Sequence, residues 1–142
     1  MAEKRISSST HAFDSTLSGV EQTIQISVRC DFDDASSSEE AQRFAFSYTV
    51  TITNRSQSAA TLVGRHWTIT DGENRVREVH GAGVVGEQPC LRPGESFQYT
   101  SGVILETPVG SMSGYFHMLG ENGSAFEAEI PAFSLAKPDM VH

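Results

Sequence analysis

The chain has 142 residues, a length typical of one domain, and a formal net charge of −8 from 18 acidic and 10 basic side chains. Hydrophobic residues make up 38% of it, including eight Phe, three Tyr and one Trp, which favours a packed core over wholesale disorder. The acidic balance disfavours duplex nucleic acid and membrane surfaces as main partners, and the chain has no apolar run long enough to span a bilayer.

Residues 1–19 are rich in Ser and Thr without apolar periodicity, so we predict a flexible N-terminal arm followed by one domain at 20–142. The first residues lack the apolar core of a secretory signal, which makes the cytoplasm the expected compartment. Cys30 and Cys90 lie far apart and form no CxxC motif. We expect both to be buried free thiols, because free cysteine behaves as a small hydrophobic residue.

From Val20 onward apolar and polar residues alternate with a period of two, which is typical of half-buried strands. Clear examples cover residues 23–30 and 44–53. The turn that begins at Asn54 is expected to be closed by side-chain hydrogen bonds to the backbone. A third strand at 61–70 has an apolar face made of Val63, Arg65, Trp67 and Ile69.

Shorter strands are predicted along the second half of the chain, with Gly, Pro and Asn turn signals between them and Pro131 breaking the last run. They cover residues 76–79, 96–101, 111–119, 125–130 and 133–135. No segment has the pattern of an amphipathic helix. These features indicate an all-β sandwich or barrel.

The segment from Gly81 to Gly86 reads G-x-G-x-x-G, but it is followed by Glu87, Gln88 and Pro89 rather than by a helix. A dinucleotide-binding fold needs that helix, so it is excluded. Two interpretations stay open. The glycines can expose backbone N–H groups to an anion, with Gly81, Gly83 and Gly86 as candidate ligands, or they can simply permit a bulge or a crossover.

Arg65 is predicted to share the inner face with Trp67, where a charge must be paired or bound to a ligand. Its head can reach a carboxylate or the sheet rim, or it can face an anion beside the glycine-rich loop. His66, His80 and His117 are weak candidates for metal binding, because none of them has metal-site spacing. The sequence shows no catalytic constellation and no cofactor motif, so we expect no cofactor.

Several ordered segments resemble the ApaG family over about residues 23–142. They are 65–71 (RHWTITD), 81–89 (GAGVVGEQP), 93–95 (PGE), 99–102 (YTSG), 107–114 (TPVGSMSG) and 130–133 (IPAF). The resemblance implies an immunoglobulin or fibronectin type III-like β-sandwich of about seven or eight antiparallel strands in a small cytoplasmic bacterial protein. It also implies an indirect association with cobalt and magnesium resistance or efflux, protein–protein recognition in related domains, and a proposed phosphate site at the glycine-rich loop. It supplies no catalytic residues.

Three functions follow as hypotheses. The first is a non-catalytic binding module for a protein partner, since sandwich loops readily supply recognition. The second is a binder, or hydrolase, of a phosphate-containing small molecule such as pyrophosphate or a nucleotide, using Gly81, Gly83, Gly86 and Arg65. The third is a divalent metal sensor. The edge strands of an open sandwich also favour a homodimer.

Overall fold

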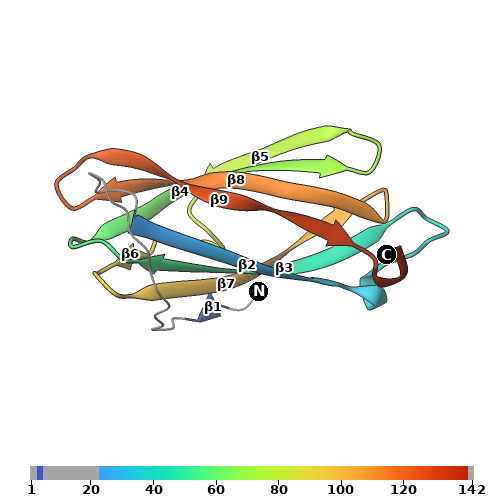
Figure 1. Ribbon diagram of the computed structural model, residues 1–142, viewed down its shortest axis with the longest axis horizontal. Coiled ribbons are helices and arrows are strands. Elements are labelled where there is room, and N and C mark those ends of the chain that lie inside the picture. Colours follow the sequence, from blue (N-terminus) through green and yellow to red (C-terminus); the bar gives the residue numbers. More distant parts are fainter. Residues whose placement is uncertain (1–2, 5–22, 141–142) are drawn as a thin grey trace.

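The computed structural model describes residues 3–4 and 23–140, which form two antiparallel sheets packed face to face (Figure 1). Sheet I has the order β1 (Glu3–Lys4), β7 (Ser96–Leu105), β3 (Phe44–Asn54) and β2 (Ile24–Phe32). Sheet II has the order β5 (Val76–Ala82), β4 (Ala60–Asp71), β8 (Val109–Gly120) and β9 (Ala125–Ala136), and β6 (Cys90–Leu91) pairs with β4.

The predicted all-β sandwich is confirmed, with seven long strands and the two-residue strands β1 and β6. Helical structure in the described residues is limited to two 3-10 turns, η2 (Asp34–Ser36) and η3 (Pro138–Met140). Within that part of the chain, no helix has the length and apolar character needed to cross a membrane. The predicted arm at 1–19 lies outside the described residues, except for Glu3 and Lys4, which pair with Tyr99 and Gln98.

The core forms where the apolar inner faces of the two sheets meet. In β3 every second residue from Phe46 to Ile52 is buried, as its alternating sequence predicts. Trp67 of β4 crosses the interface and meets Tyr48 edge-on, with ring centroids 5.3 Å apart. The ring of Phe133 in β9 lies 6.0 Å from Trp67. Such edge-to-face contacts add about 1 kcal/mol each to the burial of the rings.

A β-bulge in β4 corrects the predicted inner face of this strand. Leu62 pairs with Met118 and Gly64 with His117, so Val63 is an extra residue without a counterpart in β8. Leu62 is fully buried and Val63 only partly, so Leu62 fills the core in place of Val63. After the bulge the alternation resumes, and Arg65 pairs with the buried Phe116 on the inner side as predicted.

The prediction that Pro131 ends a strand is wrong. β9 continues to Ala136, because Pro131 lies in a bulge where Ile130 pairs with Gly114 and Phe133 with Met112. β9 is also an edge strand of sheet II, so the missing N–H of proline breaks no ladder there.

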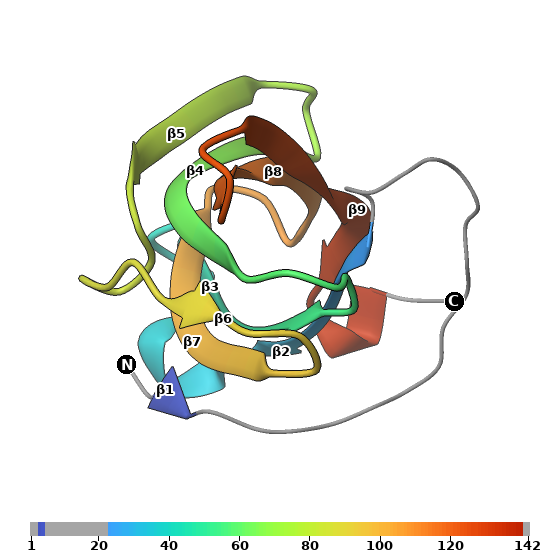
Figure 2. The ribbon, with the colours of Figure 1, turned by 90° about the vertical axis from the view of Figure 1, so that its left-hand side faces the viewer.

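The sandwich is closed along one side and open along the other (Figure 2). The edge strands β2 and β9 pack against each other, and the Cys30 thiol donates to the Ser134 carbonyl across that seam at 3.2 Å. On the other side β5 and β7 stand apart, and β7 pairs with β1 only at Gln98 and Tyr99. Both cysteines are free as predicted, but Cys90 is exposed rather than buried, and Cys30 is partly buried. Burial, with the Asp31 charge beside it, raises the pKa of the Cys30 thiol.

Asn54 fixes the β3–β4 loop from inside the protein. Its side chain is fully buried, and its Nδ2 donates to the carbonyls of Ser58 at 3.0 Å and Leu91 at 2.8 Å. Its Oδ1 accepts the backbone N–H and the hydroxyl of Ser56 at 2.8 and 2.7 Å. The predicted side-chain closure of this turn is confirmed, and it also ties the loop to β6.

Replacing Asn54 with Ala should lower the free energy of unfolding by about 3 kcal/mol, because the carbonyl of the buried Leu91 loses its donor and the N–H and hydroxyl of Ser56 lose their acceptor. Urea unfolding followed by circular dichroism measures this change. The control is Asn122→Ala, whose exposed side chain accepts one hydrogen bond from Ser124; it should change stability by less than about 0.5 kcal/mol. Equal effects of the two substitutions would contradict the role given to Asn54.

Candidate anion-binding cleft

A cleft of about 570 Å³ opens on the side where β5 and β7 stand apart, and three arginines line it. Arg65 comes from the inner face of β4, Arg77 from the inner face of β5, and Arg43 from the segment before β3. Tyr48 and Ser101 also line this space, which we call the arginine cleft. Its floor is apolar, with the buried side chains Phe46, Trp67, Ile69 and Met112.

None of the three cleft arginines has a carboxylate partner among the residues that the structure describes. By contrast, Arg75, Arg92 and Lys137 each form ion pairs with acidic side chains. The carboxylate of Asp33 also lines the cleft, and it accepts the N–H of Ser36 at the start of η2. Three guanidinium groups against one carboxylate make this a basic site on an acidic chain.

The cleft arginines are held by backbone carbonyls, which leaves most of their donors unused. Arg77 Nη2 donates to the Ile104 carbonyl at 3.1 Å, which links β5 to β7. Arg43 Nε donates to the Ser36 carbonyl at 3.0 Å. A guanidinium has five N–H donors, so each group is fixed in place and keeps donors for a ligand.

Arg65 reaches the glycine-rich segment. Its Nη1 donates to the carbonyls of Ala82 at 3.1 Å and Gly83 at 3.0 Å. A Cβ at Gly81 would lie only 3.0 Å from Nη1, so the glycine leaves the space that the guanidinium occupies. Of the two interpretations of Arg65, the contact with the sheet rim is the one seen. The guanidinium also lines the open cleft, so its contact with an anion stays a prediction.

The glycine-rich segment folds into a tight turn rather than an open loop. Val85 and Gly86 both have positive φ, 42° and 82°, and Val84 and Glu87 exchange two backbone hydrogen bonds of 2.9 and 2.8 Å. The N–H of Gly83 donates to the Val63 carbonyl at the β4 bulge. Several backbone donors of this segment are therefore already used, and an anion site on Gly81, Gly83 and Gly86 alone stays a prediction.

Tyr48, which lines the cleft, and the buried Tyr99 differ in the environment of their hydroxyls. Burial raises the pKa of Tyr48, while a hydrogen bond with Ser101 and the charge of Arg65 act in the opposite direction. Burial also raises the pKa of Tyr99 strongly, with Tyr48 adding to the effect and Arg65 opposing it. The Tyr99 hydroxyl is buried and has no hydrogen-bond partner among the described residues. Both phenols therefore stay neutral at physiological pH.

The three candidate histidines lie away from the cleft, on the outer face of sheet II. His66 pairs with His80 across β4 and β5, and their rings stack with centroids 5.5 Å apart. Tyr115 stacks on the other side of His66 at 4.9 Å and contacts His117 edge-on. His66 also lies 3.1 Å from a Glu78 oxygen. In the described part of the chain, no three His, Cys, Asp or Glu side chains gather as a metal site would require.

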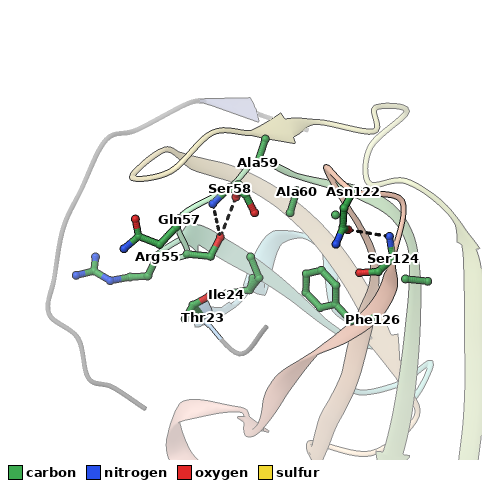
Figure 3. A pocket seen from close by; sticks show the side chains of 13 residues that line it. Thr23, Ile24, Arg55, Gln57, Ser58, Ala59, Ala60, Asn122, Ser124 and Phe126 are labelled. Atoms are coloured by element: carbon green, nitrogen blue, oxygen red, sulfur yellow. Dashed lines mark hydrogen bonds between the residues drawn. The ribbon is translucent and has the colours of Figure 1, made fainter. Parts of the chain in front are cut away.

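A second cavity, of about 810 Å³, lies at one end of the sandwich beside the β3–β4 loop (Figure 3). Polar side chains that line it bond to backbone groups nearby. The Ser56 hydroxyl donates to the Ser58 carbonyl, and the Asn122 side chain accepts the N–H of Ser124. Figure 3 shows the Arg55 side chain pointing away from Phe126. This cavity is larger, but one arginine, Arg55, lines it, whereas three line the arginine cleft.

The sequence identified Arg65 and Gly81 as site candidates, and the structure places the Arg65 guanidinium against Gly81 while Arg65 also lines the cleft. Reasoning from the sequence missed Arg43 and Arg77, which come from a loop and from an edge strand. The sequence signal for Arg77 was weak. Arg77 shares a face of β5 with Val79, while Glu78 lies on the other face, and only the pairing of Arg77 with Ile69 shows that its face is the inner one.

Replacing Tyr99 with Phe should raise the free energy of unfolding by about 1 kcal/mol, because it removes a buried hydroxyl that lacks a partner. Tyr48→Phe is the matched control and should lower stability by about 1 kcal/mol, since its hydroxyl bonds Ser101. Urea unfolding at neutral pH measures both values. A loss of stability in Tyr99→Phe equal to that in Tyr48→Phe would show that the Tyr99 hydroxyl is satisfied.

The chain is similar to proteins of one family over most of its length. The model of the ApaG domain (DUF525) matches residues 34–120. Protein ApaG of Thiobacillus denitrificans is 51% identical, and the match covers 87% of this chain and 98% of that protein. Protein ApaG of Pseudomonas paraeruginosa is 54% identical, and the match covers 83% of this chain and 95% of that protein. The crystal structure of the putative ApaA protein from Bordetella pertussis superposes with a TM-score of 0.79 at 50% identity, covering 81% of this chain and 94% of that one. The chain therefore belongs to the ApaG family.

Proposed function

We propose that this ApaG-family chain is a non-catalytic binding module whose arginine cleft recognises an anionic segment of a protein partner. The observation that carries the proposal is the presence of Arg43, Arg65 and Arg77 in one open cleft without a carboxylate partner among the described residues. Guanidinium groups bind carboxylate and phosphate through charge-assisted, often bidentate hydrogen bonds, which are the strong ones in proteins.

The lining of the cleft supports binding by an amphipathic ligand. The apolar floor around Trp67 and Met112 suits a side chain, and the partly exposed Val79 and Ile104 extend that surface at the rim. The arginines supply charge above the floor. An acidic side chain next to a hydrophobic one in the partner satisfies both parts, as in other interfaces where arginine and aromatic residues dominate.

The charge distribution supports specificity. A chain with a net charge of −8 repels anions at long range, so only an anion that fits the cleft gains enough local contacts to bind. A phosphate-containing small molecule has the same anionic chemistry as an acidic side chain and is the second candidate ligand. An association with cobalt or magnesium efflux would then be indirect, acting through the bound partner.

We expect a short peptide rich in Glu and hydrophobic residues to cause saturable shifts of the backbone amide signals of Ser101, Gly102 and Val79 in a nuclear magnetic resonance titration. Arg43→Gln and Arg77→Gln should each weaken binding by about tenfold, because each removes charge-assisted hydrogen bonds. A parallel titration with pyrophosphate separates the two ligand classes.

The matched control is Arg29→Gln, which removes the same charge from β2, outside the cleft, and should leave the affinity unchanged. An equal loss in Arg29→Gln would show that binding is only a response to net charge. Saturation by pyrophosphate alone would replace the protein partner with a small phosphate ligand. If neither ligand shifts the cleft signals at millimolar concentration, the proposal fails.

A further inference from the structure

The basic groups of the arginine cleft lie at its two ends, with an apolar stretch between them. Three cross-strand pairs form the inner rows of β4 and β5 along the cleft: Arg65 with Gly81, Trp67 with Val79, and Ile69 with Arg77. The rows of the two arginines are four residues apart along the strands, which corresponds to about 13 Å. Charge, apolar surface and charge therefore follow one another along the cleft.

The guanidinium groups of Arg65 and Arg77 keep this separation. The Arg65 group lies in the row of Gly81, because a Cβ on that glycine would lie 3.0, 3.1 and 3.2 Å from its Nη1, Nη2 and Cζ atoms. The Arg77 group reaches across to β7, where it donates to the Ile104 carbonyl. Each group thus marks one end of the cleft.

The two ends carry the same net charge. At one end Arg65 is the charged side chain that lines the cleft. At the other end Arg77 is joined by Arg43, which precedes β3, and by Asp33, whose N–H donates to the carbonyl of Ala45 in β3. Two positive charges and one negative charge leave one positive charge there. Two separate carboxylates match this arrangement better than one doubly charged phosphate does.

We propose that the cleft takes an extended segment of the protein partner, which pairs with the free edge of β7 and carries two acidic side chains four residues apart with an apolar side chain midway. This inference rests on the proposed function and specifies the segment that the cleft recognises. In an extended chain residues i, i+2 and i+4 share a face, and i and i+4 are about 13 Å apart. In a helix the same two residues are only about 6 Å apart along the axis, which is too short for the cleft.

The edge of β7 supplies the backbone partners that an extended segment needs. The Ala45 carbonyl accepts the N–H of Asp33 on the β2 side, so Ala45 and Ile104 form a pair without mutual hydrogen bonds. The Ile104 carbonyl therefore faces away from β3, as the arginine bond that it accepts shows. Because the direction of backbone groups alternates along a strand, those of Thr100 and Gly102 face the same free edge.

β1 shows that this edge accepts a strand. Its two residues, Glu3 and Lys4, pair with Tyr99 and Gln98. Beyond Tyr99 the edge of β7 has no strand partner among the described residues. A bound segment would continue sheet I from the point where β1 stops.

The rows of β7 agree with the spacing of the arginines. A segment paired with this edge has its inward side chains opposite three residues, Ser101, Val103 and Leu105. Ser101 lies at the Arg65 end, since it pairs with Tyr48, whose hydroxyl is close enough to sense the Arg65 charge. Leu105 lies at the other end, directly after the residue that Arg77 bonds. An acidic, an apolar and an acidic side chain each meet a matching part of the cleft in this register.

Three peptides of one composition, with acetylated and amidated ends, test the spacing by nuclear magnetic resonance titration. S-E-T-V-T-E-S has the proposed pattern, S-E-E-V-T-T-S has adjacent acids, and S-E-V-T-E-T-S has acids three residues apart. The first should bind about tenfold more tightly than either isomer, because only in the first do both carboxylates and the valine face inward together.

Arg77→Gln tests whether the two carboxylates occupy different ends. It should weaken binding of S-E-T-V-T-E-S by about tenfold. Of the single-acid peptides S-Q-T-V-T-E-S and S-E-T-V-T-Q-S, it should weaken one and leave the other unchanged, because the second carboxylate lies at the Arg65 end. Arg29→Gln on β2, outside the cleft, is the matched control and should change none of the three affinities.

Hydrogen exchange tests the pairing with β7. Bound S-E-T-V-T-E-S should slow exchange of the Thr100 and Gly102 amides by about tenfold or more, because both become hydrogen-bonded. Gly102→Pro removes an N–H that β3 does not use and should weaken binding, whereas Gly102→Ala keeps the N–H and should not. Thermal unfolding of both variants shows that they are folded.

Equal affinities of the three isomers, with shifts of the cleft signals, would overturn this inference and leave the proposed function standing. Unchanged exchange at Thr100 and Gly102 in the bound state would overturn it as well, as would a helical circular dichroism signal from the bound peptide. If no peptide shifts the cleft signals at millimolar concentration, the proposed function fails and this inference fails with it.

Discussion

The guanidinium of Arg65 is a charge on the inner face of the sandwich, and the open side of the structure accommodates it. It alternates with Trp67 in β4, so it lies on the inner face and cannot reach solvent through the outer one. Burying an unpaired charge costs several kcal/mol, so the group must keep acceptors and access to water. It finds acceptors at the carbonyls of Ala82 and Gly83, and it lines the open cleft. The open cleft is thus compatible with a well-packed core elsewhere.

The strands could be predicted from the sequence because each long strand buries one face, and burial of one face requires a period of two. β3 shows this most clearly. The errors occur where the backbone departs from that period. The bulge at Val63 shifts the buried face of β4 by one residue, and Pro131 looks like a strand breaker although it occupies a bulge on an edge strand. A bulge is defined by the register with the partner strand, so its position cannot be predicted from the sequence of one strand alone.

The cleft was only partly predictable for the same reason. Arg65 could be assigned to the inner face, since it stands in a regular strand beside a tryptophan. Arg77 reaches the cleft through the hairpin pairing of β5 with β4, and Arg43 reaches it from the segment before β3, where it bridges Ser38; period alone reveals neither placement. The glycine-rich segment had two interpretations because glycine permits both an open anion site and a closed turn. The turn is decided by the bonds between Val84 and Glu87, which depend on backbone geometry.

The bulge at Pro131 has a consequence for the size of any assembly built from this fold. An open sheet with two free edges can in principle add neighbours at both ends and grow into a fibre. Sheet II cannot grow at β9, because proline withholds an N–H there and β2 lies against that edge. Sheet II is therefore closed to the addition of a further strand along its β9 edge.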